Sequence, residues 1–117
     1  MNRVCFVGAA AVMIVLQGCG TQDCSSVALS GLSVRVQDPS GAEVCDAAVT
    51  ATDGDYSEVL SAGGTAQDCV FFGAIERPGT YTVTADEGGV IGTVPGVKVR
   101  SDECHVITEE VTIKLGA

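Results

Sequence analysis

The side chains with the clearest chemistry in this chain of 117 residues are its six cysteines. Cys5 lies inside an apolar run from residue 4 to residue 16, and Cys19 follows that run within the sequence LQGC. The remaining cysteines are spread over the rest of the chain: Cys24, Cys45, Cys69 and Cys104. A thiol can carry lipid, pair with another thiol, bind a metal or attack a substrate. The question is therefore which of these cysteines does which chemistry.

Residues 1–18 have the composition of a signal peptide. Arg3 supplies a positive charge, and the following residues 4–16 contain no charged or strongly polar side chain. A helix of that length spans about 20 Å, which is too short for the ~30 Å hydrocarbon core of a bilayer. We therefore expect the segment to be removed after export and not to remain as a membrane anchor.

The end of this segment resembles the lipobox of bacterial lipoproteins, in which the cysteine becomes the first residue of the mature protein. Leu16, Gly18 and Cys19 match that pattern, whereas Gln17 departs from it. The resemblance implies lipidation of Cys19, with several acyl chains that make anchoring stable. Gly20, in place of aspartate, favours the outer membrane of a Gram-negative bacterium in that family's sorting rule. An ordinary secretory signal with an unmodified cysteine is the alternative.

The charge of the chain limits its partners. Removing residues 1–18 leaves 99 residues, which suffice for one domain, and Arg3 leaves with them. Five basic residues then face fifteen acidic ones, a formal charge of about −10. Because nucleic-acid binding requires clustered Lys and Arg, nucleic acid is excluded as a partner. The acidity indicates solubility beside the membrane, with a cationic partner as the alternative.

The mature chain alternates apolar and polar residues with a period of two and shows no helical period. Residues 32–36 and 80–85 are the clearest examples. Tyr81 follows a Pro-Gly turn and is expected to form a tyrosine corner, with its hydroxyl bonded to backbone just upstream. Further strands are expected over residues 47–52, 56–61, 68–73, 90–99 with an interruption at Pro95-Gly96, and 106–115, with residues 62–65 as a connection. Seven short strands predict a Greek-key β-sandwich over residues 31–117, preceded by a tether over residues 19–30.

A wider resemblance covers residues 31–115. The order of its motifs is SVRVQDPSG at 33–41, CDAAV at 45–49, PGTYTV at 78–83 and VKV at 97–99. This order is similar to the carboxypeptidase regulatory-like domain, a prealbumin-like, Ig-like sandwich of seven strands, although residues 87–90 lack the aromatic residue usual there. The resemblance implies an accessory, adhesive or structural module.

The four cysteines of the mature domain are expected to form two disulfides, because an even number in an exported chain of this size indicates bridges. A zinc site would need closer spacing and more histidine. If neighbouring strands run antiparallel, Cys45 and Cys69 lie at one end of the sandwich, and Cys24 and Cys104 at the other. The predicted pairs are therefore Cys45–Cys69 and Cys24–Cys104. Since five Cα steps from Cys19 reach at most about 18 Å, the Cys24 end should face the membrane.

Groups that could catalyse a reaction or bind a ligand are few. His105 is the only histidine, and no serine lies in a Gly-x-Ser-x-Gly motif, so we expect neither an enzyme nor a cofactor. Asp53, Asp55 and Glu58 are weak candidates for a calcium site, and Tyr56 for a sugar platform.

The sequence thus predicts a non-enzymatic, lipid-anchored envelope protein. Its membrane contact is made through lipid on Cys19, and its domain serves as a structural or protein-interaction module. The alternative is a ligand-binding module for calcium or glycan.

Overall fold

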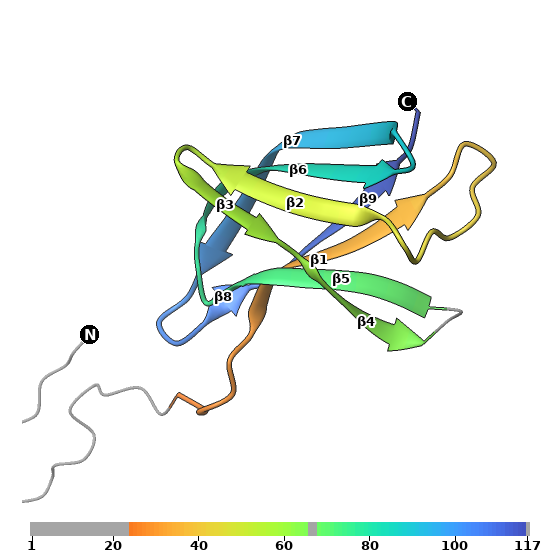
Figure 1. Cartoon of the computed structure of the whole chain (residues 1–117). Coiled ribbons are helices and arrows are strands. Elements are labelled where there is room, and N and C mark those ends of the chain that lie inside the picture. The colour runs from red at the N-terminus through yellow and green to blue at the C-terminus, as the bar shows by residue number, and fades with distance from the viewer. Residues whose placement is uncertain (1–23, 66–67, 117) are drawn as a thin grey trace, which may run out of the picture.

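The computed structural model describes residues 24–65 and 68–116, so the expected signal peptide and Cys19 lie outside the described residues. All the named elements of the described part are strands, and they form two facing sheets (Figure 1). The predicted all-β sandwich is therefore confirmed. Within the described ranges, no helix has the length and apolar character needed to cross a membrane.

The two sheets contain four and five strands. The first has the order β4 (Ser61–Thr65), β5 (Asp68–Ile75), β1 (Ser30–Gln37) and β9 (Glu109–Lys114). The second has the order β3 (Tyr56–Val59), β2 (Ala48–Asp53), β6 (Gly79–Glu87), β7 (Val90–Ser101) and β8 (Val106–Ile107). In the first sheet β1 runs antiparallel to β5 and parallel to β9.

The nine strands of the described part correct the expected number of seven. The chain changes sheets at Leu60, which is 5% exposed and whose N–H donates to the Val49 carbonyl at 2.8 Å. Residues 56–59 therefore pair with β2, and residues 61–65, expected to be mainly a connection, pair with β5. The last expected strand also divides, because β8 pairs with β7 and β9 pairs with β1.

The expected interruption at Pro95-Gly96 is a bulge within one continuous strand. β7 runs from Val90 to Ser101, and its register with β6 shifts between Tyr81 and Val83. Gly96 has φ of 69°, a left-handed conformation that suits glycine. Because the extra residue is absorbed there, apolar side chains point into the core both before and after the bulge.

The core lies between the two sheets and is formed by the alternating positions identified in the sequence. The inward side chains of β1 and β6 are fully buried: Leu32, Val34, Val36, Tyr81, Val83 and Ala85. Phe71 is 2% exposed whereas Phe72 is 38% exposed, as alternation along β5 requires. Burial of each large apolar side chain contributes about 1.5–3 kcal/mol, so this layer supplies much of the stability.

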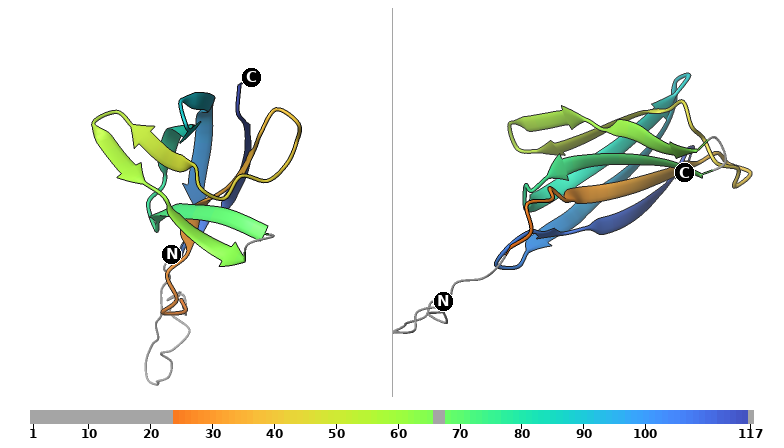
Figure 2. Two further views of the ribbon diagram at one scale, coloured as in Figure 1. Left: turned by 45° about the vertical axis from the view of Figure 1, so that its right-hand side comes forward. Right: turned by 90° about the horizontal axis from the view of Figure 1, so that it is seen from below.

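The topology gathers distant segments at each end of the sandwich. β1 and β9 start, and β5 ends, at the end where the described chain begins at Cys24 (Figure 2). We call this the Cys24 end. The turn between β6 and β7 and the connection from β1 to β2 lie at the opposite end, near the C-terminus (Figure 1). The connections after β2, β5 and β7 therefore lie at the Cys24 end of the sandwich.

Candidate functional site

Both predicted disulfides are present. Cys24 is bonded to Cys104 with a Cα–Cα distance of 5.2 Å, and Cys45 is bonded to Cys69 with a Cα–Cα distance of 5.3 Å. The first bridge is possible because β1 and β9 are parallel neighbours, so the segments that precede them meet at one end. The described residues include no free cysteine. A free thiol nucleophile is thus absent from this part of the chain.

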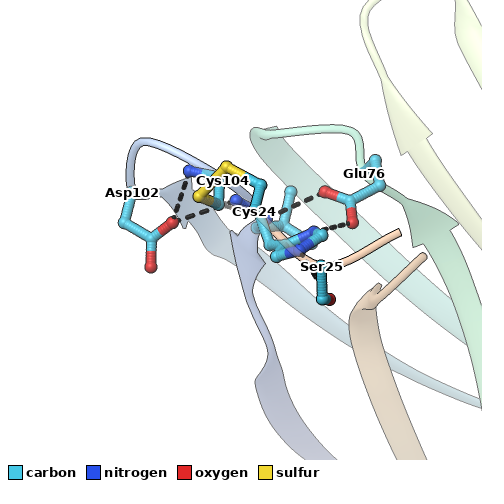
Figure 3. The surroundings of a disulfide bond; sticks show 7 residues. Cys24, Ser25, Glu76, Asp102 and Cys104 are labelled. Atoms are coloured by element: carbon cyan, nitrogen blue, oxygen red, sulfur yellow. Dashed lines mark hydrogen bonds and ion pairs between the residues drawn. A yellow bond between two sulfur atoms is a disulfide. The ribbon is translucent and has the colours of Figure 1, made fainter. Parts of the chain in front are cut away.

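Asp102 organises the turn that carries Cys104. Its Oδ1 atom accepts the backbone N–H groups of Cys104 and His105, both at 2.9 Å, and its own N–H donates to the His105 carbonyl at 2.9 Å (Figure 3). These bonds, first that from His105 and then that from Cys104, hold the pKa of Asp102 below its usual value. The position of Cys104 is therefore set by the turn as well as by the disulfide.

Glu76 connects the segment after Cys24 to this turn. Its Oε2 atom accepts the Leu29 N–H at 2.9 Å. The same atom lies 2.5 Å from His105 Nδ1, while Oε1 accepts the Val106 N–H at 3.1 Å (Figure 3). The Leu29 N–H first, and His105 second, hold the pKa of Glu76 below its usual value. We call Glu76 and these three partners the Glu76 clamp. It joins the start of β1 to the start of β8.

The backbone of Glu76 is itself unusual. Its φ is 49°, a left-handed conformation that costs a residue other than glycine about 1–3 kcal/mol. Ala74, two residues earlier, has φ of 53°. Such conformations persist only where the surroundings hold them, and the three bonds to the Glu76 carboxylate supply that constraint. The end of β5 is thus shaped to direct this carboxylate toward the N-terminal segment.

Ser25 extends the clamp into an arrangement that sequence reasoning missed. Its Oγ atom lies 3.3 Å from His105 Nε2, so Ser25, His105 and Glu76 stand in the order that nucleophilic hydrolases use. Such chemistry also needs N–H groups directed at a developing oxyanion. The four backbone N–H groups described above donate to the carboxylates of Glu76 and Asp102. These four N–H groups are therefore engaged in holding the segments of the Cys24 end together.

A second cluster at the Cys24 end contains the expected calcium candidates. The Arg77 guanidinium lies over the Tyr56 ring, 3.6 Å from its centroid, and one of its nitrogens donates to Asp53 Oδ2 at 3.1 Å. Glu58 Oε1 accepts the Tyr56 hydroxyl at 2.6 Å. This bond is the main reason that the pKa of Tyr56 is raised. Asp55 is exposed in the turn between β2 and β3.

The structure therefore does not bring the three carboxylates together as one site. Asp53 is paired with Arg77, and Glu58 also accepts the Ala74 N–H at 3.0 Å. Within the described ranges, no three His, Cys, Asp or Glu side chains form a group that could hold a metal ion. One face of Tyr56, the expected sugar platform, is covered by the guanidinium.

Tyr81 forms the predicted tyrosine corner. Its ring is fully buried, and its hydroxyl donates to the Arg77 carbonyl at 2.7 Å. The same hydroxyl accepts a hydrogen bond from the Arg77 guanidinium at 3.0 Å. The residue therefore has a structural role: it fixes the connection between β5 and β6 that also carries Glu76.

No protein-family model, curated protein or solved structure matches the chain. The proposal on function therefore rests on the contacts at the Cys24 end. The resemblances to bacterial lipoproteins and to the carboxypeptidase regulatory-like domain remain predictions.

Proposed function

We propose that this protein is a non-enzymatic domain held at the cell envelope by lipid on Cys19, where it acts as a structural or protein-interaction module. The observation that carries the proposal is the Cys24–Cys104 disulfide. This bridge fixes Cys24 to the body of the sandwich. Cys24 lies only five positions after Cys19, the cysteine of the LQGC sequence.

The short connection has a mechanical consequence. Five Cα steps reach at most about 18 Å, and the Glu76 clamp secures the chain again at Leu29. A lipid anchor at Cys19 would therefore hold the sandwich close to the bilayer. This geometry suits a module that works at the membrane surface.

The compartment is supported by the cysteines of the sandwich. Both bridges join residues far apart in the chain, with sequence separations of 80 and 24. Disulfides of this structural kind persist in oxidising compartments such as the periplasm and are rare in the cytosol. Export followed by anchoring accounts for both the apolar N-terminal run and the bridges.

The opposite end of the sandwich is the surface left for a protein partner. It carries an acidic group in which the negative charge of Asp46, with smaller contributions from burial and from Asp38, raises the pKa of Glu87. Mutual repulsion of this kind is relieved by a cationic partner. A calcium or glycan module is the less favoured function, because Asp53, Glu58 and Tyr56 are occupied by contacts within the protein.

Metabolic labelling with an alkyne fatty acid, followed by membrane fractionation, tests the anchor. The wild-type chain should take up label and remain with the membranes. Cys19→Ser should lose the label and become soluble, whereas Cys5→Ser, a change within the expected signal peptide, should keep both properties. Unchanged labelling of Cys19→Ser, or recovery of wild type only from the cytosol, would contradict the proposal.

A further inference from the structure

The Cys24 end exposes an unusual share of large apolar side chains. The described part of the chain has eight exposed large hydrophobic residues, and four of them lie here. Their exposed fractions are 61% for Val27, 38% for Leu29, 59% for Ile75 and 50% for Ile107. Scattered exposed apolar residues need no explanation, but a group at one end indicates a contact surface.

Hydrogen bonds and strand register place these residues together. Ser30 pairs with Ile75 across β1 and β5, and the Glu76 N–H donates to the Leu29 carbonyl at 2.9 Å. The Thr108 hydroxyl donates to the Ser30 carbonyl at 2.7 Å, which brings Ile107 beside the start of β1. Leu29 and Ile75 border the ends of β1 and β5 in the first sheet, and Ile107 lies in β8 of the second sheet, just before β9. Val27 lines the same surface hollow as Glu76 and His105. We call these four residues the apolar rim.

We propose that the apolar rim rests on the lipid bilayer and enters its headgroup and acyl-chain boundary. The inference depends on the proposed anchor at Cys19, because the length of chain between Cys19 and Cys24 decides what lies opposite the rim. Only four residues separate Cys19 from Cys24, which leaves the bilayer as the nearest surface to this end. Tethering also gives a weak contact an effective concentration of about millimolar, so a small rim suffices.

The charges at the two ends agree with this orientation. The carboxylates of Glu76 and Asp102 at the Cys24 end accept hydrogen bonds from the protein, and Glu103 is exposed beside them. At the opposite end the carboxylates of Asp46 and Glu87 repel one another. The opposite end, where these carboxylates repel one another, therefore points to water. Because Glu103 and the overall negative charge disfavour anionic lipid, the rim fits a zwitterionic bilayer.

A second copy of the chain is the competing occupant of the rim. Two mature chains carry about −10 each, so their association would bring like charges together. The bilayer imposes no such repulsion when its lipid is zwitterionic. We therefore commit to the bilayer, and the experiment below separates the two occupants.

The chain contains no tryptophan, which allows one fluorophore to be placed at a chosen position. Ile107→Trp and Val27→Trp report on the rim. Val90→Trp, 43% exposed at the turn after β6, is the matched control at the opposite end. Each acylated full-length variant is extracted from membranes and reconstituted into phosphatidylcholine vesicles, with and without brominated acyl chains. Variants are compared only where melting and both disulfides match wild type.

If the apolar rim enters the bilayer, the tryptophan emission of the Ile107 and Val27 variants should be blue-shifted. That emission should be lost when the lipid is brominated. The Val90 variant should show neither change. Equal responses of all three acylated variants would overturn the rim alone. A blue shift without quenching, accompanied by cross-linked dimers, would assign the surface to a second copy. A protein whose intact mass shows no acyl chains would instead contradict the proposed function on which the rim rests.

Discussion

The side chains of Glu76 and His105 meet at 2.5 Å although 29 positions separate them in the sequence. Glu76 directly follows the end of β5, and His105 lies in the turn before β8. The contact closes the Cys24 end, because the same carboxylate also binds the N–H groups of Leu29 and Val106. The Glu76 side chain thus links the segment before β1, the turn before β8 and the start of β8.

The Glu76 clamp predicts acid sensitivity. Because the pKa of Glu76 is held below its ordinary value of 4.5 in the folded protein, the carboxylate stabilises the fold at pH values above that number. This contribution is lost as the pH falls through the lower, folded pKa. Wild type should therefore lose melting temperature in that acid range, and Glu76→Gln should lose less.

Thermal melts over a series of acid buffers measure this difference. Ser25→Ala is the control, since it removes the contact with His105 Nε2 and leaves the bonds of Glu76 in place. It should follow the wild-type profile. Parallel profiles for wild type and Glu76→Gln would show that the clamp does not contribute to acid sensitivity.

The tyrosine corner predicts a larger loss for Tyr81→Phe than for Tyr56→Phe. Tyr81 is fully buried, and without its hydroxyl the Arg77 carbonyl loses a donor at 2.7 Å, a change that costs about 1–3 kcal/mol. The Tyr56 hydroxyl bonds to Glu58 in a partly exposed place, so its removal should cost less, about 0.5–1.5 kcal/mol. Urea unfolding with unchanged m-values measures both losses. The reverse order would argue against the corner.

The two disulfides should contribute unequally to stability. Their sequence separations of 80 and 24 correspond, in the chain-entropy model, to about 4.5 and 3.5 kcal/mol of restriction on the unfolded chain. The double variant Cys24→Ser with Cys104→Ser should therefore unfold at lower urea than Cys45→Ser with Cys69→Ser. If the second pair proved the more costly, local contacts around Cys69 would outweigh loop length.

Relief of repulsion at the opposite end should stabilise the protein. The pKa of Glu87 is raised, first by the charge of Asp46, so its ionised form opposes folding at neutral pH. Glu87→Gln should therefore raise the melting temperature at neutral pH, and the gain should disappear in acid, where the wild-type group is protonated. Asp46→Asn should act in the same direction. A lower melting temperature at neutral pH for both variants would contradict this assignment of charges.

Local patterns were sufficient for much of the fold. Alternation along residues 32–36 and 80–85 identified the buried faces of β1 and β6, and a Pro-Gly turn identified the role of Tyr81. The disulfide pairs followed from strand polarity alone. Each of these inferences depends on neighbours within a strand or on the ends of strands, which sequence periodicity can locate.

Features created by tertiary contacts were not predictable in the same way. The chain changes sheets at Leu60, so the expected strand over residues 56–61 ends early in one sheet, and the expected connection over residues 62–65 forms part of a strand in the other. The contact of Ser25 with His105 spans 80 positions, and the left-handed backbone of Glu76, whose carboxylate contacts the same imidazole, has no local signature. The stacking of Arg77 on Tyr56, which covers the expected sugar platform, likewise has no local signature.

We propose that Cys19 carries the membrane anchor, whereas Cys24 belongs to the fold. The intact mass of the protein extracted from membranes, followed by non-reducing peptide mapping, tests both statements at once. We expect a chain that begins at Cys19 with attached acyl chains and contains the Cys24–Cys104 and Cys45–Cys69 bridges. An unacylated chain with reduced thiols, or a peptide that links Cys24 to Cys45, would contradict the account.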